Sequence, residues 1–127
     1  MPTDELDLLI VEDDDGFRDT ALRWMERKGH RVEAAANGQE ALKLCDRRHF
    51  EVAVVDMNMP GISGLEFLQR LRETNVDTEV IILTGQATVE NAVAAMKLGA
   101  CDYLTKPCPL AEVERRCLMA AERGRLQ

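Results

Sequence analysis

The sequence lacks three features that would narrow its function at once: paired cysteines, an excess of positive charge and a long hydrophobic run. None of its cysteines forms a Cys-x-x-Cys pair, and neither histidine lies at zinc-finger spacing from a cysteine. We therefore expect thiols in a reducing compartment, rather than disulfides or a zinc site, at Cys45, Cys101, Cys108 and Cys117.

The net charge of -7 argues against non-specific binding to nucleic acid, because no basic patch offsets it. No run reaches the length of a transmembrane helix, and the acidic residues 1–5 form no apolar signal core. These absences predict a cytoplasmic protein that contacts neither membranes nor nucleic acid directly. We expect His30 and His49 to lie on loops or on the surface, and we assign them no role.

The length predicts a single domain over residues 1–127, with a core from about residue 7 to residue 123. Apolar runs alternate with amphipathic segments, which is typical of an α/β fold with a buried parallel sheet. Strands are expected at residues 8–11, 32–36, 52–55, 80–84 and 103–105. Helices are expected at residues 17–28, around 41–45, around 65–71, and at 88–98 and 110–123. Right-handed crossovers then give a doubly wound, five-stranded parallel sheet with five helices.

Charged or hydroxyl-bearing residues follow four of these strands at the same kind of position. Glu12 and Asp13 follow the first strand, Asp56 follows the third, Thr84 ends the fourth and Lys106 follows the fifth. Because the carboxyl ends of parallel strands line one edge of an open sheet, these side chains should meet there. Three carboxylates together need a compensating cation, and an all-oxygen donor set suits Mg²⁺ better than zinc. A carboxylate can itself accept a phosphoryl group, whose oxygens a lysine and a threonine would bind.

Each of these residues alone has an ordinary structural explanation. A strand-end aspartate often caps a loop, a lone lysine is usually solvated, and a strand threonine bonds locally. The acidic run at residues 13–15 is, by itself, most simply a solvated loop. Only their joint occurrence at successive strand ends favours a phosphoryl site.

The chain resembles the receiver domains of two-component response regulators. The resemblance rests on Glu12-Asp13, on Asp56-x-x-Met59-Pro60-x-x-x-Gly64, on Thr84-Gly85 and on Lys106-Pro107. It implies a flavodoxin-like fold of the receiver type. It also implies a phosphoprotein that acts as a switch, whose only reactions are phosphotransfer to itself and its own dephosphorylation.

By this resemblance Asp56 is the phosphoacceptor, supplied by a histidine kinase, a phosphotransfer protein or a small donor such as acetyl phosphate. Mg²⁺ is the implied cofactor, and its implied ligands are Asp13, Asp56, the backbone carbonyl of Asn58 and, through water, Glu12. The groups implied to bind the phosphoryl oxygens are Thr84, Lys106 and the backbone N–H groups of Met57 and Gly85. Thr84 and Tyr103 are implied to form the switch, and the Lys106-Pro107 bond is expected to be cis.

The resemblance also implies a surface that changes shape on phosphorylation. It is formed by residues 88–98, 101–105 and 110–123. In receivers this face often forms a homodimer or contacts an output domain.

Three other functions were weighed against this one. A phosphatase with an aspartyl-phosphate intermediate typically needs a second aspartate two residues after the nucleophile, where this chain has Asn58. A flavodoxin-like cofactor binder needs a Ser/Thr/Gly-rich loop after the first strand, whereas residues 12–15 are acidic and repel phosphate. A degenerate receiver that only binds other proteins stays open as an alternative, although the complete acidic set with Thr84 and Lys106 argues against it.

Overall fold

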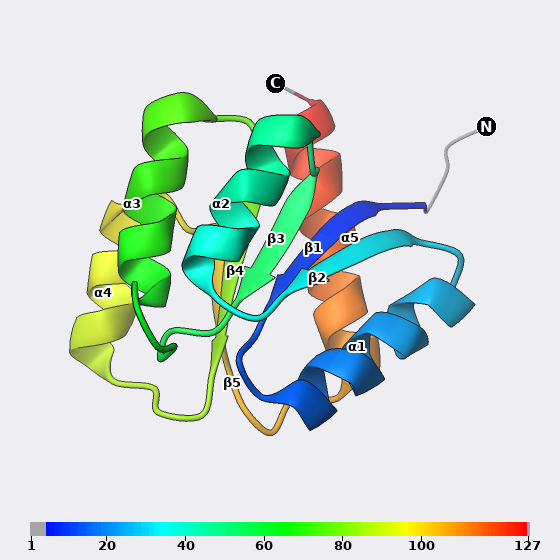
Figure 1. Ribbon diagram of the computed structural model, residues 1–127, viewed down its shortest axis with the longest axis horizontal. Coiled ribbons are helices and arrows are strands. Elements are labelled where there is room, and N and C mark those ends of the chain that lie inside the picture. Colours follow the sequence, from blue (N-terminus) through cyan, green and yellow to red (C-terminus); the bar gives the residue numbers. More distant parts are fainter. Residues whose placement is uncertain (1–4, 127) are drawn as a thin grey trace.

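A parallel sheet of five strands forms the centre of the molecule, in the order β2-β1-β3-β4-β5 (Figure 1). The computed structural model describes residues 5–126, so most of the acidic N-terminal segment considered above lies outside the described residues. The strands are β1 (Asp7–Val11), β2 (Arg31–Ala35), β3 (Val52–Val55), β4 (Glu79–Thr84) and β5 (Asp102–Thr105). The predicted α/β fold with its doubly wound parallel sheet is confirmed.

One helix follows each strand, as predicted. The helices are α1 (Asp15–Arg27), α2 (Gly38–Arg47), α3 (Gly64–Thr74), α4 (Val89–Lys97) and α5 (Leu110–Arg125). Four of them begin after a residue whose side chain accepts a backbone N–H of the first turn, namely Asp14, Asn37, Ser63 and Thr88. Such caps satisfy donors that have no partner inside the helix, each at a gain of about 1 kcal/mol. Thr88 therefore lies at the predicted start of α4, while α1 begins two residues before the predicted Phe17.

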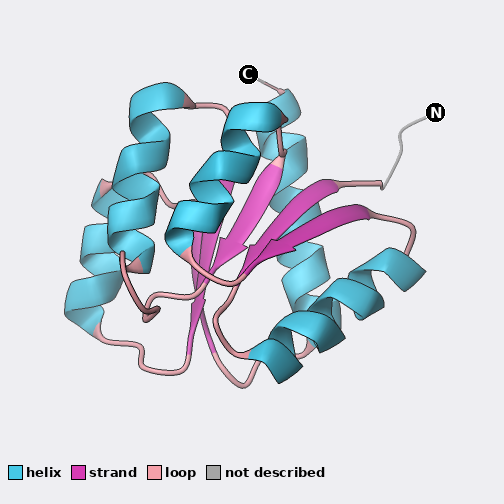
Figure 2. Cartoon of the chain, viewed as in Figure 1, coloured by secondary structure: helices cyan, strands magenta, loops and turns pink. Residues whose placement is uncertain are grey.

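The helices cover both faces of the sheet (Figures 1 and 2). Side chains of successive strand residues point alternately to the two layers. Leu9, Val11 and Val55 pack with residues of α2, α3 and α4. Leu8 and Ile10 pack on the opposite face with residues of α1 and α5. Because both faces are buried, the strands read as continuous apolar runs, which is the pattern the sequence displayed.

His30 lies in the loop between α1 and β2, as expected, but it is buried rather than exposed at the surface. Its Nδ1 accepts the backbone N–H of Leu6 at 3.1 Å, so the ring proton is on Nε2. Nε2 then donates to Glu114 of α5 at 2.6 Å, and the exposed fraction of the His30 side chain is 1%. Glu114 is therefore the partner of this buried ring. The pair joins the start of β2 to α5.

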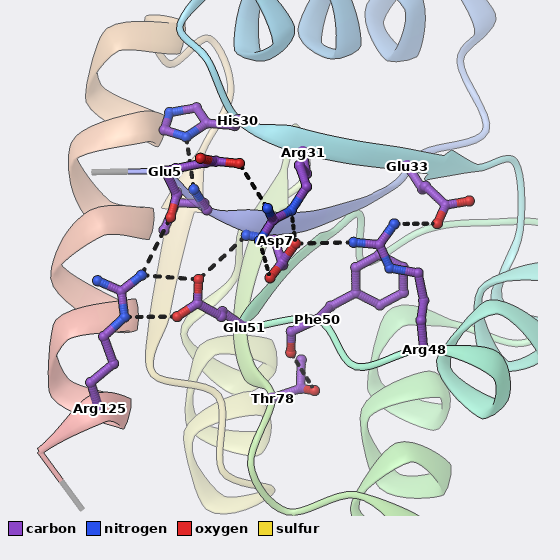
Figure 3. A network of polar contacts seen from close by, with 11 residues as sticks. Glu5, Asp7, His30, Arg31, Glu33, Arg48, Phe50, Glu51, Thr78 and Arg125 are labelled. Carbon is purple, nitrogen blue, oxygen red and sulfur yellow. Dashed lines mark hydrogen bonds and ion pairs between the residues drawn. The ribbon is translucent and has the colours of Figure 1, made fainter. Parts of the chain in front are cut away.

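Ion pairs connect the amino ends of the strands, at the edge of the sheet opposite to the one where Glu12, Asp13 and Asp56 lie (Figure 3). Asp7 accepts from Arg31 at 2.7 Å and from Arg48 at 3.1 Å. The hydrogen bond from Arg31 is the main reason that the pKa of the Asp7 carboxyl is below its usual value. Arg125 forms a two-pronged pair with Glu51, at 2.8 and 3.0 Å, which fastens the last turn of α5 to the start of β3.

The sequence predicts neither disulfides nor a membrane-spanning helix. All four cysteines, at 45, 101, 108 and 117, are free thiols rather than disulfides. Within residues 5–126, no helix has the length and apolar character needed to cross a bilayer.

Candidate functional site

The predicted residues gather where the chain direction across the sheet reverses. From β1 the chain goes outward to β2 and then crosses back to β3, β4 and β5, so β1 and β3 flank the switch point. In open α/β sheets, ligands bind in the crevice outside the carboxyl ends of the strands at this point. Glu12 and Asp13 leave β1 and Asp56 leaves β3, which places the acidic residues on the two sides of the crevice.

Backbone hydrogen bonds continue the sheet one residue beyond the strands and fix three site residues. Glu12 donates its N–H to Ala35 at 3.0 Å, and Asp56 donates to Val11 at 3.0 Å. Lys106 donates to the carbonyl of Thr84 at 2.8 Å. The site residues therefore project from the rigid end of the sheet, although they lie outside the strands.

Three carboxylates converge. Oxygen atoms of Glu12, Asp13 and Asp56 lie within 4.8 Å of one another, which makes them a group able to hold a metal ion among the described residues. Glu12 is buried, Asp13 is exposed, and the exposed fraction of the Asp56 side chain is 11%. Hard oxygen donors with one side open to solvent fit Mg²⁺, which keeps several water ligands. The acidic cluster is therefore compatible with Mg²⁺.

Lys106 provides the positive charge of the site. Its Nζ lies 2.5 Å from Glu12 Oε1 and 3.8 Å from Asp56 Oδ2. On another side, the same Nζ lies 4.5 Å from the ring centroid of Phe17. The lysine was predicted beside Asp56, and it does lie there, but it is closest to Glu12. The peptide bond between Lys106 and Pro107 is cis, as expected.

Polar groups from the ends of β3 and β4 complete a cleft of about 310 Å³. Thr84 is buried, and its hydroxyl accepts the backbone N–H of Gln86 at 3.2 Å. Asn58 donates its backbone N–H to Asp56 Oδ1 at 3.3 Å, and its side-chain amide contacts that of Gln86 at 3.5 Å. The cleft is lined by Glu12, Asp13, Asp14, Asp56, Asn58, Thr84, Gly85, Gln86 and Lys106.

A glycine allows α3 to begin directly beneath Asp56. A Cβ on Gly64 would lie 2.5 Å from the carbonyl oxygen of Asp56 and 2.9 Å from the Cα of Met57. No other residue fits without moving this backbone. Met57 itself is buried in the core, so only its backbone can serve the site.

Tyr103 lies on β5, partly buried against the core layer of α2, α3 and α4. Its hydroxyl group is buried and has no hydrogen-bond partner among the described residues. A buried hydroxyl without a partner is unfavourable, so this side chain has a reason to change position. Its position is compatible with the predicted switch but does not test it.

Most of the predicted site residues therefore meet at one cleft, while Met57 and Tyr103 lie outside its lining. The sequence analysis includes Phe17 in the predicted helix at residues 17–28 but assigns it no role in the site. It also treated Asp14 as solvated, with the metal site as a neighbour at most. Asp14 caps α1 by accepting the N–H of Phe17 at 3.0 Å, and its own N–H donates to Glu12 at 3.2 Å. The sequence did contain a signal for this cap, namely an aspartate three residues before the first apolar residue of the helix.

A comparison with family profiles matches residues 8–117 to the response regulator receiver domain. Among curated proteins, the transcriptional regulatory protein TcrA of Mycobacterium tuberculosis is 36% identical over 117 residues. The match covers 92% of this chain and 46% of TcrA, so the chain spans about half the length of that relative.

Two solved structures are similar to this chain. A response regulator from Burkholderia pseudomallei with a phosphorylated aspartic acid is 34% identical, with a TM-score of 0.83 and coverage of 94% of this chain and 70% of that one. The response regulator TrrA of Thermotoga maritima, in complex with Mg²⁺ and BeF, is 26% identical, with a TM-score of 0.80. That match covers 89% of this chain and 96% of TrrA.

Proposed function

This chain belongs to the response regulator receiver domain family, whose members are phosphoacceptor switches of two-component systems, and we propose that its phosphoacceptor is Asp56. The observation that carries the assignment is the convergence of three carboxylates and Lys106 on one cleft at the switch point of the sheet. Glu12 and Asp56 both have a backbone fixed by the sheet and an oxygen near Lys106. The Glu12 oxygen is paired with the lysine at 2.5 Å and its side chain is 4% exposed, whereas Asp56 Oδ2 lies 3.8 Å from the lysine and its side chain is 11% exposed, which leaves Asp56 more accessible to a phosphoryl donor.

The reaction is transfer of a phosphoryl group to Asp56 Oδ2. This oxygen attacks phosphorus, the new P–O bond forms, and the bond to the donor breaks with its electron pair remaining on the leaving group. A phosphohistidine donor releases imidazole, and acetyl phosphate releases acetate. Such transfers depend chiefly on positioning and on stabilisation of negative charge, which Lys106 and the Thr84 hydroxyl supply to the phosphoryl oxygens. The backbone N–H groups of Met57 and Gly85 bind the remaining oxygens.

Asp13, Asp56 and the backbone carbonyl of Asn58 would hold Mg²⁺, with Glu12 acting through water. When bound, the ion neutralises charge on the carboxylates and on the incoming phosphoryl group. The TrrA complex with Mg²⁺ and BeF supports this cofactor for a related chain. Glu12 has a second task, since its Oε1 lies 2.5 Å from the Nζ of Lys106.

The absence of an acid/base group at Asn58 supports a switch rather than a turnover enzyme. An amide can neither give nor take a proton at neutral pH, so it does not activate water to hydrolyse the acyl phosphate. The phosphorylated state then persists until slow hydrolysis removes the group.

Phosphorylation is transmitted through Thr84 and Tyr103. The Thr84 hydroxyl accepts the N–H of Gln86 at 3.2 Å, and a shift of this hydroxyl toward a phosphoryl oxygen, to which it would donate, pulls on that hydrogen bond. The loop after β4 then moves, and Tyr103 changes position with it, since its buried hydroxyl has no partner within residues 5–126 that would hold it in place.

The output surface is the face of residues 88–98, 101–105 and 110–123. Large apolar side chains are exposed on it, namely Val89, Val93, Met96 and Met119. Val93 and Met96 line one shallow apolar hollow on α4, and exposed apolar side chains that lie together are typical of an interaction site. A second copy of the chain or an output domain is the partner of this face, and a histidine kinase or phosphotransfer protein is the phosphoryl donor.

The acyl phosphate can be located by chemical reduction. Borohydride converts a phosphorylated aspartate to homoserine, which mass spectrometry of proteolytic peptides assigns to one residue. After incubation with acetyl phosphate and Mg²⁺, homoserine is expected at position 56. Homoserine at position 13, or the reduced product of glutamate at position 12, would instead refute the assignment of Asp56 as the acceptor.

A further inference from the structure

The ammonium of Lys106 is held from more than one side. Glu12 lies at 2.5 Å and Asp56 at 3.8 Å, while the ring centroid of Phe17 lies at 4.5 Å. The exposed fraction of the lysine side chain is 23%, so most of its length is removed from water. An ammonium over an aromatic ring within about 6 Å is attracted by the negative face of that ring.

We propose that Phe17 is a positioning residue for phosphoryl transfer, whose ring holds the Lys106 ammonium within reach of Asp56. The proposal rests on the function proposed above. It assigns Phe17 a role separate from the hydrophobic contact that the same residue makes with the α1 and α5 layer of the core.

The position of the ring is determined by the start of α1. Asp14 accepts the backbone N–H of Phe17 at 3.0 Å, and it donates its own N–H to Glu12. The helix cap therefore connects Phe17 and Glu12, which both contact the ammonium. A shift of the helix start would move both of them together.

The ring has a function that the carboxylates cannot fulfil. A lysine side chain has four flexible bonds and loses considerable entropy when it is held in one place. Glu12 and Asp56 attract it only while their charges are not shared with another cation or engaged by a phosphoryl group. The attraction to the ring is independent of what these carboxylates bind, so it keeps the ammonium in place throughout the reaction.

Substitution of Phe17 tests this role. Phe17→Leu removes the ring face and keeps an apolar side chain, whereas Phe17→Tyr and Phe17→Trp keep a ring. Phe50→Leu is the matched control, because the ring of Phe50 also lies under a cation, Arg48 at 4.6 Å, but near the amino end of β3. The melting temperatures of all variants are compared with that of the wild type.

Two measurements are made on each protein. The first is the NMR chemical shift of the Lys106 ε-methylene, which a ring current moves upfield. The second is the maximal rate of phosphorylation by acetyl phosphate at saturating Mg²⁺, separated from the half-saturating donor concentration. We expect Phe17→Leu to lose the upfield shift and to lower the maximal rate about 2- to 30-fold, the range that cation–π attractions correspond to.

Retention of the shift and of the rate in Phe17→Tyr and Phe17→Trp supports the proposal, together with a normal rate in Phe50→Leu. The proposal is overturned if the Lys106 shift is the same in Phe17→Leu, or if Phe50→Leu slows the reaction equally at a similar loss of stability. If the wild type accepts no phosphoryl group, the proposed function fails and the positioning role fails with it. If Phe17→Leu loses the upfield shift but keeps the wild-type rate, the ring contacts Lys106 without serving the reaction, and the positioning role is overturned.

Discussion

Replacing Asp56 by asparagine should stabilise the protein in the absence of Mg²⁺. Asp56 lies within 4.8 Å of two other carboxylates, and among the described residues the cation paired with it is Lys106, at 3.8 Å. The repulsion between Asp56 and each of the other two carboxylates, taken at 4.8 Å, is about 3.5 kcal/mol at an effective dielectric constant of about 20 and about 0.9 kcal/mol at about 80. The attraction between Asp56 and Lys106 at 3.8 Å is about 4.4 and about 1.1 kcal/mol at the same two dielectric constants. Two repulsions exceed one attraction at either limit, which leaves a net cost of about 0.5 to 2.5 kcal/mol in the wild type.

This cost converts to a measurable melting temperature. For a chain of this length, 1 kcal/mol corresponds to about 4 °C, so Asp56→Asn should melt about 2 to 10 °C higher. Calorimetry at low ionic strength with a chelator present measures the difference. The control is Asp19→Asn, an exposed residue of α1, whose substitution should change the stability by less than about 0.5 kcal/mol. An unchanged or lower melting temperature for Asp56→Asn would refute the repulsion argument.

Mg²⁺ should reverse this order of stability. An ion that binds only the folded state at a concentration of about 100 times its Kd adds about 2.7 kcal/mol. The wild type offers the complete carboxylate set and should gain more from the ion than Asp56→Asn does. An equal gain in both proteins would contradict a site that includes Asp56.

Three further predictions concern residues around the site and the core. Tyr103→Phe should raise the free energy of unfolding by about 1 kcal/mol, because it removes a buried hydroxyl that has no partner in the described part of the chain; thermal melts measure this, and a clear loss of stability would show that the hydroxyl is satisfied. Burial raises the pKa of Cys45 to about 11 and that of Cys101 to about 12, so both thiols should react with Ellman's reagent at pH 8 far more slowly in the folded than in the denatured protein. Hydrogen bonds from Arg115 and then Arg116 lower the pKa of Glu112 from 4.5 to about 2; because the folded value is lower, the resulting stability is complete above pH 4.5 and is lost as the pH falls through about 2. Glu112→Gln should therefore show a smaller loss of melting temperature over that range.

The sheet and its site were predictable because each depends on local sequence. Strands buried on both faces must be apolar along their whole length, so β1, β3 and β4 are visible as uninterrupted runs. The edge strands β2 and β5 are less buried and gave weaker signals, although their bounds, like those of β1 and β4, differ by only one residue from those predicted. The residues at the strand ends then followed from the topology alone.

The parts that could not be predicted are contacts between distant segments. His30 and Glu114 are 84 residues apart, and no periodicity marks them as partners. Likewise, Phe17 fits the apolar stripe of α1, and only the folded chain shows that its ring also faces the ammonium of Lys106. Side-chain pairs of this kind depend on how helices pack against the sheet, which apolar patterning leaves undetermined.

The most direct test of the account is the intact mass of the protein after incubation with acetyl phosphate, with and without Mg²⁺, for the wild type and Asp56→Asn. The account predicts the gain of one phosphoryl group in the wild type only when Mg²⁺ is present, and no gain in Asp56→Asn. A phosphoryl group that appears on Asp56→Asn, or on the wild type equally well without Mg²⁺, would contradict the assignment of Asp56 in an acidic metal site as the phosphoacceptor.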